Sequence, residues 1–224
     1  MNYAIAIDGP AGAGKSTIAK ILAQELELIY VDTGALYRTI GYYVTGLGID
    51  TADTDGVVAA LPNLKVELKY VDGVQRVFAN GEDVSDLIRT PAMSMAASAV
   101  SAIPAVREYL LDTQRGIAAA HSVVMDGRDI GTVILPDAKI KIFLTASAES
   151  RARRRFDELQ TKGDPATYEE VLADMVKRDY DDSHRAIAPL KQAEDAIPVD
   201  TSGETLEQSV ARLKEIVYNK LNEE

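Results

Sequence analysis

The feature that most constrains this chain is a glycine-rich loop near its N-terminus. Residues 4–7 are apolar and lead through Asp8 into residues 9–16, which fit the pattern G-x-x-x-x-G-K-[S/T] without a mismatch. Residues 15–28 then follow with the apolar spacing of a helix. A strand, a glycine loop and a helix in this order are the context in which backbone N–H groups and a helix N-terminus surround phosphate oxygens.

This loop predicts a binding site for a nucleoside triphosphate. The Lys15 ammonium would reach the β and γ phosphates, and the Ser16 hydroxyl would hold Mg²⁺. The predicted ATP-binding residues are Gly9, Pro10, Ala11, Gly12, Ala13, Gly14, Lys15, Ser16 and Thr17. The alternative is a glycine-rich turn with a chance lysine. The loop by itself does not separate a kinase from a GTPase switch or a motor.

A second acidic position supports the same interpretation. Residues 123–125 form an apolar strand pattern that ends at Asp126. An aspartate at the end of such a strand is the usual partner of Mg²⁺ in folds of this kind. Strands often end in aspartate for other reasons, so this position gains weight from the phosphate loop. The predicted metal ligands are Ser16 and Asp126.

Composition excludes several other classes of protein. The chain has 224 residues with a formal net charge of -11 and no cysteine. The acidic balance argues against a nucleic-acid polymer as partner, and the missing thiols exclude disulfides, thiolate catalysis and cysteine zinc sites. The N-terminal residues lack the basic and apolar regions of a signal peptide, and no apolar run approaches the roughly 20 residues of a membrane helix. We therefore expect a cytoplasmic protein without a membrane partner, and a monomer.

The order of elements predicts an α/β fold. Strand patterns occur at residues 4–7, 28–31, 122–125, 139–146 and 196–199, and helical patterns at 15–28, 34–46, 91–103, 104–120, 148–160, 168–180 and 204–221. This alternation favours a central parallel sheet with helices on both faces. Residues 63–85 differ, because they alternate with period two around turns at Asp72-Gly73 and Asn80-Gly81, which predicts a small antiparallel insert.

Several arginines lie where a phosphate ligand would explain them. Arg38 and Arg128 each follow a predicted strand, and ligands of open α/β sheets bind beyond the carboxyl ends of strands. Helical spacing places Arg151, Arg154 and Arg155 on one face, while Arg153 points elsewhere. We expect that face to belong to a mobile lid that closes on the ATP phosphates, the alternative being a solvated helix face.

A second charged group shows helical spacing as well. Arg178, Asp182 and Arg185 are related by i, i+4 and i+7. The group is either a structural ladder of ion pairs or a mixed-charge face toward a sugar and a phosphate.

The motifs along nearly the whole chain resemble those of the bacterial cytidylate kinase family. The resemblance rests on Ile7-Asp8-Gly9-Pro10-Ala11-Gly12-Ala13-Gly14-Lys15-Ser16, Asp32-Thr33-Gly34-Ala35-Leu36-Tyr37-Arg38, Asp126-Gly127-Arg128-Asp129-Ile130-Gly131-Thr132-Val133, Lys141-Ile142-Phe143-Leu144-Thr145-Ala146 and Arg185-Ala186-Ile187-Ala188-Pro189-Leu190. The antiparallel insert resembles the enlarged nucleotide-binding segment of bacterial members. One difference is Thr33, which keeps the hydroxyl of the serine that many members carry and adds a methyl group.

The resemblance implies a P-loop NTPase fold and a kinase that uses ATP with Mg²⁺ to phosphorylate CMP or dCMP in pyrimidine metabolism. It implies one kinase unit over residues 1–224, with an acceptor-binding segment at 34–108 and a lid at 148–166. It further implies three sets of acceptor-binding residues. These are Thr33, Arg107, Asp129 and Arg185 for the cytosine, Ser98, Arg178 and Asp182 for the sugar, and Arg38 and Arg128 for the phosphate.

The expected reaction is direct in-line transfer from ATP to an oxygen of the CMP phosphate. That phosphate is largely ionised near pH 7, so no general base is required, and Lys15, Arg128, Arg151 and Arg154 would share the developing charge. Asp129 would accept a hydrogen bond from the cytosine amino group, its alternative role being a salt bridge to Arg128 or a neighbour. The rival hypotheses are a kinase for UMP or another small acceptor, and a nucleotide-dependent switch or binding module.

Overall fold

The computed structural model describes residues 2–71 and 73–223, and the chain divides into two compact units. The first unit comprises the residues up to Tyr30 together with those from Ala118 onward, and the second comprises Val31–Ile117. Each unit buries a hydrophobic core of its own. No helix in the described part of the chain combines the length and the apolar character that crossing a bilayer requires.

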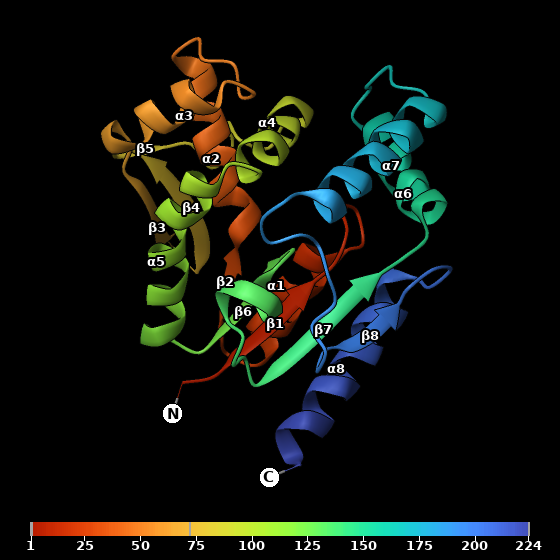
Figure 1. Cartoon of the computed structure of the whole chain (residues 1–224). Coiled ribbons are helices and arrows are strands. Elements are labelled where there is room, and N and C mark those ends of the chain that lie inside the picture. The colour runs from red at the N-terminus through yellow and green to blue at the C-terminus, as the bar shows by residue number, and fades with distance from the viewer. Residues whose placement is uncertain (1, 72, 224) are drawn as a thin grey trace. The chain divides into compact units, whose positions relative to one another are not determined.

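A five-stranded sheet forms the centre of the first unit, in the order β2-β6-β1-β7-β8 (Figure 1). Its strands are β1 (Ala4–Asp8), β2 (Ile29–Asp32), β6 (Val123–Gly127), β7 (Ile140–Thr145) and β8 (Ile197–Asp200). The middle strand β1 pairs in parallel with both β6 and β7, and β7 pairs in parallel with β8. Parallel pairing puts the carboxyl ends of β1 and β6 at the same edge, so the segments that follow them are neighbours.

Two helices pack on this sheet and two more form a separate hairpin. Apolar residues of α1 (Lys15–Glu25) and α8 (Leu206–Asn222) join the core of the sheet. The helices α6 (Ala148–Thr161) and α7 (Tyr168–His184) share a smaller core. A capping box at Thr167 begins α7, because the Thr167 and Glu170 side chains satisfy each other's backbone N–H groups.

The second unit combines helices with a small antiparallel sheet. Its elements are α2 (Thr33–Gly46), α3 (Thr54–Ala60), the 3₁₀ helix η1 (Leu61–Asn63), β3 (Val66–Val71), β4 (Val74–Ala79), β5 (Glu82–Asp83), α4 (Pro91–Ser101) and most of α5 (Pro104–Ala120). The strands pair antiparallel in the order β3-β4-β5. Pro91 stands in the first turn of α4, where its missing N–H costs no hydrogen bond.

These observations confirm the predicted α/β fold with a parallel sheet and an antiparallel insert. The Asp72 half of one predicted turn lies outside the described residues. Three elements were not predicted: the short helix α3, the 3₁₀ helix η1, and a π-helical turn η2 (Ile130–Ile134) directly after Asp129. The prediction that Arg185 continues the helical group of Arg178 and Asp182 is wrong, because α7 ends at His184 and the Arg185 backbone is extended.

We predict that the close packing of α2 on α4 makes Gly41 intolerant of substitution. A Cβ atom at Gly41 would lie 2.8 Å from the Cβ of Ala96 on α4. A Cβ atom is fixed to the backbone, so it cannot rotate away. Gly41→Ala should lower the free energy of unfolding by about 1–2 kcal/mol in urea denaturation, since overpacking outweighs the gain in helix propensity. Gly46→Ala, at the open end of the same helix, is the control and should leave stability unchanged or raise it by up to about 1 kcal/mol. Equal effects of the two substitutions would contradict this explanation.

Candidate active site

The glycine loop runs between β1 and α1 in a conformation that the sequence motif requires. Gly9 has φ of 147°, and a Cβ atom there would lie 1.9 Å from the carbonyl oxygen of Leu144 on β7. Only glycine therefore lets the chain pass so close to the neighbouring strand. Because α1 begins at Lys15, the loop ends on a helix N-terminus, where backbone N–H groups attract anions.

Lys15 lies inside its own loop. Its Nζ donates a hydrogen bond to the carbonyl oxygen of Pro10 at 2.7 Å, and its side chain is buried. Burial and the positive charge of Arg128 hold the pKa of Lys15 well below its usual range, although three neighbouring aspartates counteract them. A phosphate oxygen beside the ammonium would relieve this unfavourable burial of positive charge.

The two predicted metal ligands lie side by side. The Ser16 hydroxyl donates to Oδ2 of Asp126 at 2.8 Å, and the Tyr30 hydroxyl donates to Oδ1 of the same carboxylate at 2.8 Å. Within residues 2–71 and 73–223, no group of three or more His, Cys, Asp or Glu side chains could hold a metal ion.

Asp8, the last residue of β1, is a buried carboxylate that the sequence analysis did not assign to the site. Its two oxygens accept hydrogen bonds from the backbone N–H groups of Ile130 at 2.8 Å and Gly131 at 2.7 Å. Burial raises the pKa of Asp8 to about 6, although the two N–H groups counteract part of that effect. Asp8 thus fixes the start of η2, directly after Arg128 and Asp129.

A network of charges in the first unit joins most of the acceptor-binding residues predicted there. Nε of Arg128 donates to Asp182 at 2.8 Å, and Asp182 also lies 3.9 Å from Arg185. Arg185 in turn lies 3.6 Å from Oδ1 of Asp129. Burial raises the pKa of Asp182, but the Arg128 and Arg178 charges outweigh it and hold the pKa below its usual value. The ion-pair alternative for Asp129 is therefore realised with Arg185.

In the second unit, charged residues gather where α2 begins. Asp32 is the N-cap of α2 and accepts from the backbone N–H of Ala35. The same carboxylate pairs with Arg38 and with Arg89, each at 2.8 Å. Burial raises the pKa of Asp32, but the two arginines outweigh it and lower the pKa. Thr33 is buried at the first position of this helix.

The other predicted residues of the second unit lie on α4 and α5. Arg107 is buried, donates to the carbonyl oxygen of Ser101 at 3.3 Å and lies over the ring of Tyr37, 5.5 Å from its centre. Tyr37 and Thr33 are one turn apart on α2 and share a face of that helix. Ser98 is partly buried on α4, and its carbonyl oxygen accepts from the Ser101 hydroxyl.

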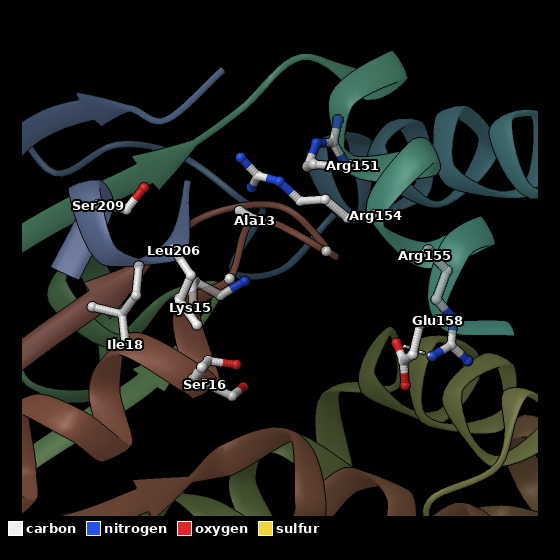
Figure 2. A pocket seen from close by; sticks show the side chains of 13 residues that line it. Ala13, Lys15, Ser16, Ile18, Arg151, Arg154, Arg155, Glu158, Leu206 and Ser209 are labelled. Carbon is white, nitrogen blue, oxygen red and sulfur yellow. Dashed lines mark hydrogen bonds and ion pairs between the residues drawn. The ribbon is translucent and has the colours of Figure 1, made fainter. Parts of the chain in front are cut away.

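A cavity of about 420 Å³ opens beside the phosphate loop in the first unit (Figure 2). Loop residues from Gly12 to Ser16 line it, together with Leu206 and Ser209 from the start of α8. Arg151, Arg154 and Arg155 line it from α6, which confirms that they share one face of the helix. Arg153 packs instead over the ring of Tyr168, as its different direction predicted.

The arginines of α6 differ in how they are held. Arg151 is buried and donates to the loop carbonyl of Ala11 at 2.9 Å, and it also forms an ion pair with Asp179 of α7. Arg154 donates to the carbonyl oxygen of Thr201 at 2.8 Å, and Arg155 pairs with Glu158. In this structure Arg151 connects α6, α7 and the phosphate loop, so its guanidinium faces the loop.

The residues that the sequence analysis missed have one property in common. Each of them has a partner that is distant in the sequence: Asp8 with Ile130, Tyr30 with Asp126, Asp32 with Arg89, and Asp179 with Arg151. Only Asp32 carried a local signal, because it precedes a helix in the position of an N-cap.

We predict that Asp8 makes stability fall as pH rises. Its pKa is higher in the folded protein than the ordinary 3.8, so between about pH 4 and pH 6 the folded state binds more protons than the unfolded state. Asp8→Asn keeps the shape of the side chain and does not titrate. The free energy of unfolding of the wild type, minus that of the variant, should decrease by up to about 3 kcal/mol over this range and then level off. A difference that stays constant in urea denaturation from pH 4 to 8 would show that Asp8 has no raised pKa.

Comparison with known proteins shows which family the chain belongs to. The family model described as cytidylate kinase matches residues 5–219. A cytidylate kinase of Carboxydothermus hydrogenoformans is 50% identical over 216 residues, covering 96% of this chain and 97% of that protein. One of Lactobacillus johnsonii is 47% identical over 222 residues, covering 98% and 96%. An uncharacterized protein from Eubacterium ventriosum of known structure has a TM-score of 0.51 at 12% identity, covering 97% of this chain and 99% of that one. The chain belongs to the cytidylate kinase family.

Proposed function

We propose that the protein transfers the γ-phosphoryl group of ATP to CMP or dCMP, giving ADP and CDP or dCDP. The observation that carries this proposal is the cytidylate kinase match over residues 5–219, in a chain whose phosphate-loop residue Ser16 donates a hydrogen bond to Asp126. We also propose that the enzyme works in the cytoplasm as a monomer, on small nucleotides and not on a nucleic-acid polymer. Residues 34–108 would be the acceptor-binding segment and residues 148–166 the lid.

ATP would bind along the phosphate loop, with Lys15 on the β and γ phosphates. Ser16 and Asp126 suit Mg²⁺, because one hydroxyl and one carboxylate are the oxygen ligands that this ion takes beside phosphates. Bound Mg²⁺ would neutralise charge on the transferred phosphoryl group. The cavity between the loop and α6 supports this placement, since Arg154 and Arg155 line it and can approach the anionic part of the ligand.

Residues of each unit would bind the acceptor. In the first unit, Arg128 would hold the acceptor phosphate, Arg178 and Asp182 the sugar, and Asp129 and Arg185 the cytosine. In the second unit, Arg38 would hold the phosphate, Ser98 the sugar, and Thr33 and Arg107 the cytosine. The ion pairs Arg128–Asp182 and Arg185–Asp129 support this assignment, because they hold these arginines in fixed positions before a ligand arrives.

Transfer itself would depend on positioning and charge. The attacking oxygen belongs to the CMP phosphate, whose second pKa of about 6 leaves it largely ionised near pH 7, so no side chain has to remove a proton. Lys15, Arg128, Arg151 and Arg154 would stabilise the negative charge that spreads over the transferred group. Arg151 would exchange part of its ion pair with Asp179 for phosphate oxygens when the lid closes.

We predict that ADP release depends on the acceptor and on Lys15. In a coupled assay with CMP, dCMP, UMP and AMP in parallel, CMP and dCMP should give kcat/KM well above the other two. Lys15→Ala should lower kcat by about 10²–10³-fold, the usual cost of removing one group that stabilises transition-state charge. A circular dichroism spectrum like that of the wild type would show that the variant is folded. Preference for UMP, or near-normal turnover of a folded Lys15→Ala variant, would overturn the proposal.

We predict that Asp129 discriminates cytosine from uracil in the acceptor nucleotide. Its carboxylate accepts from the cytosine amino group, whereas uracil offers an oxygen there, and an unpaired buried polar group costs about 1–3 kcal/mol. Asp129→Ala should therefore lose most activity on CMP, and its ratio of kcat/KM for CMP over UMP should fall roughly 10- to 100-fold. Asp137→Ala, at an exposed position of the following loop, is the control and should keep the ratio. An unchanged ratio in Asp129→Ala would mean that another residue discriminates the bases.

A further inference from the structure

The Asp126 carboxylate is held by two hydroxyl groups, one on each oxygen. Ser16 donates to Oδ2 and Tyr30 donates to Oδ1, both at 2.8 Å, and the carboxylate is buried. The phosphate loop motif accounts for Ser16. Nothing in that motif accounts for Tyr30, which comes from β2 and lies 96 positions away from Asp126 in the sequence.

The two hydroxyls can serve different purposes. A serine hydroxyl has one proton and two lone pairs, so Ser16 can offer a lone pair to a cation while its proton stays on Asp126. The Tyr30 ring packs against the hydrophobic core of the first unit, and Lys20 lies over it, 5.6 Å from its centre. A ring held in this way fixes its hydroxyl, whereas a serine hydroxyl rotates freely about one bond.

We infer that Tyr30 is a positioning residue that orients the Asp126 carboxylate for the Mg²⁺ ion that accompanies ATP. This inference rests on the proposed function. The last side-chain bond of an aspartate is a broad torsion, and a hydrogen bond on each oxygen restrains rotation about it. The hydrogen bond from the Tyr30 hydroxyl to Oδ1 therefore keeps Oδ2 in its orientation beside Ser16. Hydrogen-bond partners of this kind typically change metal affinity by 10- to 100-fold when they are removed.

Core packing by itself would not require the hydroxyl. Phenylalanine offers the same ring to the core, so a purely structural role for Tyr30 predicts that Tyr30→Phe leaves metal binding intact. The direction of the hydroxyl toward a buried carboxylate is the observation that favours the positioning role.

The test compares metal-dependent and metal-free nucleotide binding in Tyr30→Phe. Binding of Mn²⁺ would be titrated by electron paramagnetic resonance in the presence of a non-hydrolysable ATP analogue, and analogue binding would be measured in EDTA. We expect the Kd for Mn²⁺ to rise about 10-fold, with metal-free analogue binding and the KM for CMP unchanged. The Mg²⁺ concentration for half-maximal activity should rise by a similar factor. Tyr109→Phe, which removes a hydroxyl bonded to the Leu64 carbonyl in the second unit, is the matched control and should change none of these values.

Two further variants separate the possible failures. If Asp126→Asn weakens Mn²⁺ binding and Tyr30→Phe does not, the inference about Tyr30 is wrong and the proposed metal site stands. If neither variant changes Mn²⁺ binding, the metal site itself is wrong. In the Asp126→Asn background, Tyr30→Phe should add less than twofold, since its effect passes through that carboxylate. Equal weakening with and without metal would mean that Tyr30 acts on the fold or on the nucleotide, and would overturn the inference.

Discussion

The burial of charge at the carboxyl ends of β1 and β6 is the constraint on which the rest of the site depends. Asp8, Lys15 and Asp126 are all buried in this region, and each is costly to hold there without a partner. Their partners are backbone N–H groups, a loop carbonyl and two hydroxyls. Because these bonds lie within the protein itself, they fix the shape of the phosphate loop and of the segment after β6.

The same principle explains the arginines. Arg128 and Arg151 are each bound to a carboxylate of α7, through Asp182 and Asp179 respectively. These ion pairs satisfy the guanidinium groups and hold them at fixed places in the first unit. Replacing either carboxylate by a neutral side chain would leave a buried guanidinium without its ion-pair partner, which is costly.

The Asp8 carboxylate also supports the segment that follows β6. Asp8 holds the start of η2 through Ile130 and Gly131, directly after the two residues proposed to contact the acceptor. The N-cap residue of η2 is Asp129, whose side chain makes no capping bond to the helix. Asp8 thus accepts the N–H groups at the start of η2, which an N-cap side chain usually does. The Asp129 carboxylate pairs instead with Arg185.

The phosphate loop, the neighbouring strands and the antiparallel insert could be predicted from the sequence, because each depends on the spacing of neighbouring residues. The sequence also grouped Arg151, Arg154 and Arg155 on one face of a helix. Only the tertiary structure showed that Asp8 binds Ile130, that Tyr30 reaches Asp126 and that Arg185 lies beyond the end of α7. The first two contacts join residues 122 and 96 positions apart, and they exist because parallel strands bring distant segments to one edge of the sheet. The spacing of neighbouring residues in the sequence does not indicate such contacts.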